Sequence, residues 1–73
     1  MRYVVLVFDR SRAKILARED FMADQREQAW SAHDRLVRQH LGTSDVEVVM
    51  LGAASEADLH ATHGRYFAPP LAI

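Results

Sequence analysis

The chain contains no cysteine and little glycine or proline, and these shortages limit what it can be. Without cysteine it can form no disulfide and no thiolate metal site. Its three glycines are isolated from one another, so no glycine-rich loop is available to hold a phosphate. The longest apolar run, residues 3–8, is too short for a signal-peptide core or a membrane span. We therefore expect a cytoplasmic protein with no membrane contact, no metal and no cofactor.

Seventy-three residues are enough for one domain but only for a small core. An apolar fraction of 49% with 26% charged residues is typical of a globular chain and argues against disorder. Small domains without disulfides often gain stability by oligomerisation. We expect a single α+β domain over residues 1–68, followed by an extended apolar tail over residues 69–73.

The charges are unevenly distributed along the chain. The net charge of −1 gives the whole molecule no bias toward nucleic acid. Residues 1–18, however, carry five basic side chains against one acid, a net of +4, whereas residues 19–73 carry four against nine, a net of −5. A molecule with one basic and one acidic part can associate with itself or with a charged partner.

A β-hairpin is predicted at the N-terminus. Residues 2–8 are β-branched, aromatic or leucine apart from Arg2, and both alternating sets are apolar, which is typical of a strand buried on both faces. Residues 9–12 form a polar turn that starts with Asp9. Residues 13–18 return as a second strand.

The period then changes from two to 3.6 residues, which predicts a helix over residues 23–41. Asp24 is the expected N-cap with Glu27 as its capping-box partner, and Gly42 the expected C-terminal stop. At 100° per residue, eight residues fall within one arc of about 140°. They are Met22, Ala29, Trp30, His33, Leu36, Val37, His40 and Leu41. Trp30 is the largest apolar contribution to this face.

A third strand over residues 46–51 and a short helix from Ser55 to about His63 complete a ββαβα order. The long helix returns the chain so that the third strand lies beside the first. We expect a three-stranded antiparallel sheet of order 2-1-3, with both helices packed on one face.

Helices on one face leave the other face open, and that face carries the predicted partner-binding residues. Leu16 and Val49 are its apolar part, and the edge strand adds a basic rim. The candidate partner-binding residues are Arg10, Arg12, Lys14, Leu16, Arg18 and Val49. The competing interpretation is that residues 66–73 fold over this face and cover it.

Nucleic-acid binding is the alternative function. The hairpin bases Arg10, Arg12, Lys14 and Arg18 could follow a phosphate backbone, and Tyr3 could stack on a base. The acidic remainder of the chain and an isoelectric point of about 6.4 argue against it. Charged side chains at a hairpin also protect edge strands from unwanted pairing.

The histidines and serines give little support for catalysis. His33 and His40 fall in the apolar arc and are expected either to pack or to form a pH-sensitive contact with a partner helix. His60 and His63 are spaced to share a metal, but no recognised ligand pattern accompanies them. No serine lies in a nucleophile elbow. We therefore predict a protein that is not an enzyme.

The stretch Val46-Glu47-Val48-Val49-Met50-Leu51-Gly52-Ala53, followed by Ser55, Leu59, Thr62-His63 and Arg65-Tyr66-Phe67, carries a resemblance. It resembles the ends of small uncharacterised proteins from high-GC bacteria and their phages, over roughly residues 45–67. The resemblance implies a small accessory or regulatory protein and assigns no site residues. Together these observations predict a non-enzymatic interaction or regulatory module that can self-associate, as a homodimer, through its open face or an edge strand.

Overall fold

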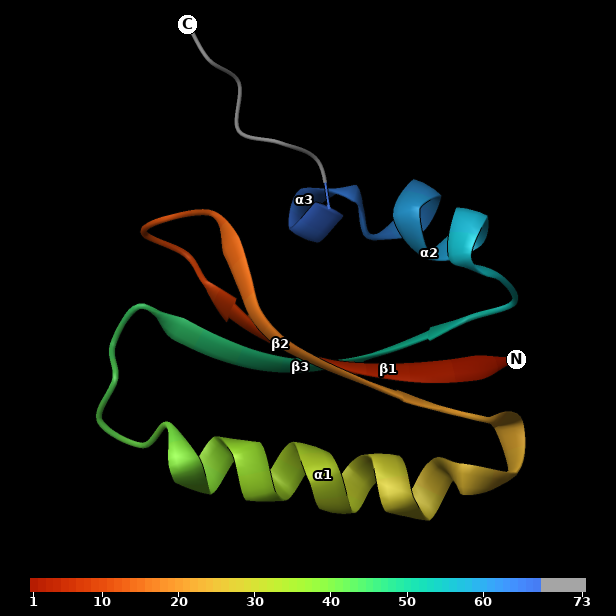
Figure 1. Cartoon of the computed structure of the whole chain (residues 1–73), viewed down its shortest axis with the longest axis horizontal. Helices are drawn as coiled ribbons and strands as arrows, with labels where there is room; N and C mark the ends of the chain where they lie inside the picture. The colour runs from red at the N-terminus through yellow and green to blue at the C-terminus, as the bar shows by residue number, and fades with distance from the viewer. Residues whose placement is uncertain (68–73) are drawn as a thin grey trace, which may run out of the picture.

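The computed structural model describes residues 1–67, which form a three-stranded sheet with helices on both sides (Figure 1). The strands are β1 (Arg2–Asp9), β2 (Lys14–Phe21) and β3 (Val46–Ala53). The helical elements are η1 (Ala23–Gln25), α1 (Arg26–Gln39), α2 (Glu56–Thr62) and α3 (Gly64–Phe67). The tail predicted for residues 69–73 lies outside the described residues.

The sheet has the predicted order β2-β1-β3, with antiparallel neighbours throughout. The central strand β1 is buried from Val4 to Phe8 without interruption. Consecutive residues of a strand point to opposite faces, so β1 must be covered on both sides. This requirement explains why its sequence shows no polar–apolar alternation.

The helices lie on opposite faces of the sheet, which corrects the expectation that they share one (Figure 1). α1 covers Val5 and Val7, while Leu59 of α2 packs on the Val4 and Leu6 side. The two faces of β1 are about equally apolar, so each needs its own cover. The expected open sheet face is therefore absent: α2 and α3 lie over it.

The C-terminal part of the described chain completes this second layer. Tyr66 and Phe67 of α3 pack against the core that contains Val4, Leu6 and Leu59. The ring of Tyr66 meets that of Phe8 edge to face, with centroids 5.0 Å apart. The competing interpretation, that the end of the chain covers this face, is thus confirmed for Tyr66 and Phe67.

The long helix is shorter than predicted and begins differently. Residues 23–25 form a single 3₁₀ turn, and Gln25 precedes α1 in place of the predicted Asp24 cap. The backbone N–H of Met22 donates to the side-chain oxygen of Gln25 at 2.8 Å, which satisfies one end of that turn. Gly42 follows the helix with φ +85, a conformation that glycine adopts without strain.

The hairpin forms as predicted, with β2 extending three residues further than expected, to Phe21. The Asp9 carboxylate accepts hydrogen bonds from the N–H groups of Ser11 and Arg12 and from the Ser11 hydroxyl. Ala17 pairs with Val7 and Ile15 with Phe8, so Leu16 is an extra residue in β2, a β-bulge. The bulge gives the edge of the sheet an irregular outline at Leu16.

Candidate association surface

The two edge strands of the sheet differ in how well they are protected from pairing. β2 carries four charged residues and the bulge at Leu16. Charges and bulges are the usual devices by which proteins prevent a free edge from accepting another strand. β2 is therefore poorly suited to strand addition.

β3 has none of this protection. It pairs with β1 through eight consecutive residues without a bulge, it contains no proline, and Glu47 is its only charged residue. Among residues 1–67, β1 is the only strand beside it. A long, regular and mainly apolar edge of this kind is a ready template for a further strand.

The outward-facing backbone groups of β3 can be assigned from the ladder. The Arg10 N–H donates to the Asp45 carbonyl at 2.8 Å, directly beyond the Asp9–Val46 pair that ends the β1–β3 register. Bonded and non-bonded pairs alternate in an antiparallel ladder. From Glu47 onward, every second residue therefore bonds to β1. The N–H and C=O groups of Val48, Met50 and Gly52 and the C=O of Val46 point to the free edge, whereas the Val46 N–H donates to the Thr43 carbonyl at 3.3 Å.

An apolar stripe on α1 lies next to this edge. We define the α1 stripe as Trp30, His33, Val37 and Leu41. Trp30 is 42% exposed, Val37 37% and Leu41 73%, and the Trp30 and His33 rings meet edge to face at 5.4 Å. At 100° per residue Trp30, His33 and Val37 lie within about 60° of one another, beside the buried line of Ala29, Ala32 and Leu36. Leu41 follows just after α1, which ends at Gln39.

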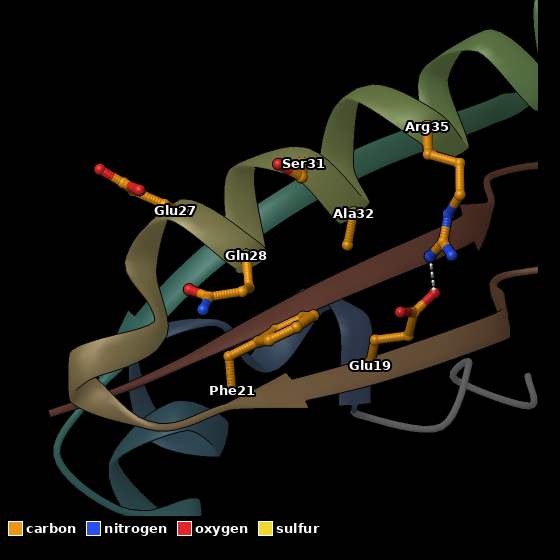
Figure 2. A pocket seen from close by; sticks show the side chains of 7 residues that line it. All are labelled: Glu19, Phe21, Glu27, Gln28, Ser31, Ala32 and Arg35. Carbon is orange, nitrogen blue, oxygen red and sulfur yellow. Dashed lines mark hydrogen bonds and ion pairs between the residues drawn. The ribbon is translucent and has the colours of Figure 1, made fainter.

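The groove on the other flank of α1 shows which way the stripe faces. Gln28, Ser31 and Arg35 line this groove over β2 (Figure 2). Helical periodicity places Trp30, His33 and Val37 on the opposite flank of α1, toward β3. On the α1 face of β3, Val46, Val48 and Met50 are only half-buried. We call the outer edge of β3 together with the α1 stripe the association surface.

The groove itself has a volume of about 470 Å³ but is a weak candidate for a ligand site. Arg35 donates to Glu19 across it, which joins α1 to β2 (Figure 2). The principal charged groups facing the groove thus neutralise each other. The remaining lining residues are Phe21, Glu27, Gln28, Ser31 and Ala32.

The predicted partner-binding residues do not form one surface. Val49 is half-buried and packs against the core beneath α2 and α3. Arg18 lies on the same face but donates to Glu56 at 2.7 and 3.0 Å and to Asp20 at 2.8 and 2.9 Å. The covering of this face by α2 and α3 removes the surface on which Arg18 and Val49 were expected to meet a partner.

The remaining predicted residues lie at the hairpin tip and on the β2 edge. The Arg10 guanidinium donates to the Ser44 carbonyl at 2.7 Å, and Arg12 lies 3.7 Å from the Asp9 carboxylate. Lys14 is exposed and has no ion-pair partner within residues 1–67, and Leu16 is 46% exposed at the bulge. The accessible basic group is therefore smaller than the sequence suggested.

The ion pairs around Arg18 shift the pKa of several groups. Hydrogen bonds from Arg18 and then His60 lower the pKa of Glu56 to about 2. Hydrogen bonding from Arg18 also lowers the pKa of Asp20, and hydrogen bonding from Glu56 and Asp20 raises that of Arg18. At the turn, the Ser11 hydroxyl lowers the pKa of Asp9. Glu56, Asp20 and Arg18 stay charged at neutral pH and join α2 to β2.

Two of the four histidines, His60 and His33, have side-chain partners. The His60 ring is 2.8 Å from a Glu56 oxygen and stacks on Phe67 with centroids 4.2 Å apart. His33 hydrogen-bonds to Asp34 at 3.1 Å beside Trp30. Within residues 1–67 no three acidic, histidine or cysteine residues are grouped so that they could hold a metal. In the same part of the chain, no helix has the length and hydrophobicity needed to cross a membrane.

Sequence reasoning missed that the helix face divides into a buried and an exposed part. The arc of eight residues contained both Leu36 and Trp30, and periodicity alone does not say where a narrow sheet stops covering a helix. The predicted strand order 2-1-3 makes β3 an edge strand, and this could have indicated that part of the helix face extends beyond the sheet and stays exposed.

No family model, no curated protein and no solved structure matches this chain.

Proposed function

We propose that the protein is a small, non-enzymatic protein-interaction module, acting in the cytoplasm, whose association surface receives an extended segment of a partner protein. The segment adds a strand beside β3 while its apolar side chains, or an adjoining helix, pack on the α1 stripe. Strand addition provides main-chain hydrogen bonds, and alternate side chains provide specificity.

The observation that carries this proposal is the position of Trp30. α1 buries two alanines and one leucine against the sheet, while its tryptophan and Val37 remain exposed, as does Leu41 just after the helix. Burial of such side chains is the main source of stability in a small domain, so a fold that leaves them outside forgoes a large stabilisation. Aromatic residues in apolar surface patches are also frequent anchors of protein interfaces.

Nucleic-acid binding is the second candidate, supported by the exposed side chains of Arg12 and Lys14 at the hairpin tip. The participation of Arg18 in ion pairs with Glu56 and Asp20 weakens it, because fewer bases remain for phosphate. A regulatory or accessory role, which the resemblance of residues 45–67 implies, is compatible with an interaction module.

Site-specific photo-crosslinking in the native host tests the proposal. A photoreactive amino acid replaces Leu41 in the α1 stripe, Leu16 on the β2 edge, or Lys14 at the hairpin tip. We expect protein adducts from position 41 and few from position 16. Protein adducts from position 16 and not from 41 would show that the association surface is wrong. Nucleic-acid adducts from position 14 would support the second candidate instead.

A further inference from the structure

We infer that the partner is a second copy of this chain, paired through β3 about a two-fold axis that passes beside Val49. This inference rests on the proposed function and names its partner. The assembly is a continuous six-stranded antiparallel sheet in which the two β3 strands lie together at the centre.

The backbone of β3 determines the register. Val48, Met50 and Gly52 have outward-facing N–H and C=O groups, and Val46 adds an outward-facing C=O, its N–H being bonded to Thr43. A two-fold axis at Val49 places Val48 opposite Met50 of the second copy and Val46 opposite Gly52 of the second copy. All four outward-facing residues then pair only with one another, and in the Val46–Gly52 pair the Gly52 N–H donates to the Val46 carbonyl. An axis at Val48 or Met50 would leave at least one of them opposite a residue outside this set.

The side chains in this register are compatible. On the α1 face, valine meets methionine, and the other valine meets a glycine, which has no side chain to obstruct it. On the opposite face, Val49 meets its own copy. Glu47 lies opposite Leu51 of the second copy, and its carboxylate is already bonded to Arg65 at 2.9 Å. No two like charges face each other.

The same axis brings the two α1 stripes toward each other. A two-fold axis perpendicular to the sheet keeps both α1 helices on one face, and each stripe is on the β3 side of its helix. Trp30 and Val37 of each copy therefore face the axis from either side. One operation covers the free strand edge and the exposed apolar stripe together, which a strand-shaped peptide alone would not do.

The assembly also ends at two copies. Its outer edges are the two β2 strands, which carry the charges and the bulge at Leu16. Such edges resist further strand addition, so the sheet does not extend into a fibre. The two edges of one monomer thus differ in what they can do: the β3 edge can pair with a second copy, and the β2 edge is protected from pairing.

Analytical ultracentrifugation over a wide concentration range tests the inference, since a dimer has twice the 8.3 kDa mass of the chain. Trp30 is the only tryptophan and is 42% exposed, so its emission should shift to shorter wavelength as the protein associates. The first variants are Trp30→Arg and Leu41→Arg in the stripe, of which Leu41, at 73% exposure, tolerates change with least effect on folding.

The third variant, Val48→Pro, removes an outward-facing N–H without breaking a hydrogen bond to β1. Leu16→Arg is the control on the other edge: the same substitution of a leucine, with Leu16 46% exposed against 42% for Trp30 and 73% for Leu41. We expect the three interface variants to weaken dimerisation by about tenfold or more and the control to leave it unchanged. Circular dichroism establishes that each variant is folded.

The outcomes separate this inference from the proposed function. A monomer at every concentration overturns the second copy as partner; the proposed function then stands only if position 41 crosslinks to another protein. A dimer disrupted by Leu16→Arg and unaffected by Leu41→Arg overturns both. If Val48→Pro fails to fold, the comparison of Leu41→Arg with Leu16→Arg decides whether the dimer forms through the association surface.

Discussion

The Arg18 guanidinium donates two hydrogen bonds to the Glu56 carboxylate, at 2.7 and 3.0 Å, and so joins β2 to the first turn of α2. Asp20 accepts from the same guanidinium, and Arg2 lies 3.2 Å from both carboxylates. The four side chains alternate in charge and connect β1, β2 and α2. Their role is to hold the second helical layer on the sheet.

This arrangement predicts a loss of stability in acid. The pKa of Glu56 is about 2 in the folded protein against an ordinary value of 4.5, so the unfolded chain binds the proton more readily. The stabilisation from Glu56 is complete above pH 4.5 and disappears as the pH falls toward 2. Asp20, whose pKa is also lowered, acts in the same direction. Urea unfolding at several pH values measures this dependence.

The Glu56→Gln variant should unfold more easily than the wild type at neutral pH, and the difference should shrink as the pH falls through this range. Glu27→Gln is the control, since Glu27 is exposed on α1 and has no ion pair within residues 1–67. A constant difference between Glu56→Gln and wild type from neutral pH to pH 2 would contradict the account. High salt should reduce the effect because the pair is partly exposed.

Leu59 is predicted to be the main apolar anchor of the second layer. It is fully buried, and it is the only buried residue of α2. Leu59→Ala should lower the free energy of unfolding by about 2–5 kcal/mol, the usual range for a buried leucine. Hydrogen exchange should rise first in α2. An equal rise in α1 and α2 would indicate that the two layers unfold together.

Much of the fold could be predicted because local signals and topology agreed. Ser55 as an N-cap and the acids that follow it predicted α2, and the Ser55 hydroxyl oxygen does accept from the Asp58 N–H at 3.1 Å. The apolar character of β1 on both sides gave its central position. The same property should have implied a cover on each face, but the prediction placed both helices together.

The association surface was less predictable for a physical reason. Whether Trp30 is in the core depends on how far the sheet extends beneath α1, which is a tertiary property. Likewise Arg18 was predicted to be accessible to a partner. Its ion-pair partner Glu56 is 38 residues away in the sequence, so the pair could not be recognised from local pattern. The hairpin charges were counted correctly, yet their partners could be found only after α2 had been placed.

Ala13 offers a test of backbone strain in the hairpin. Its φ of +52 is in the left-handed region, which costs a residue with a Cβ roughly 1–2 kcal/mol relative to glycine. Ala13→Gly removes this strain, but part of the gained stability is lost because glycine makes the unfolded chain more flexible. We expect a net stabilisation of about 0.5–1 kcal/mol by urea unfolding. Ala57→Gly in α2, where glycine is unfavourable, should destabilise by about 1 kcal/mol; the same sign for both would contradict the prediction.

The last prediction concerns the basic hairpin tip and its partner. If the association surface is the working surface, the protein should show no measurable binding to duplex or single-stranded DNA or RNA, even at low salt where phosphate contacts are strongest. Fluorescence anisotropy with labelled oligonucleotides measures this. Binding that weakens steeply with salt, and whose logarithmic salt slope falls by about 0.9 in Lys14→Ala, would reverse the order of the two candidate functions. Arg38→Ala on α1 removes one positive charge away from the hairpin tip, so it controls for the change in net charge alone.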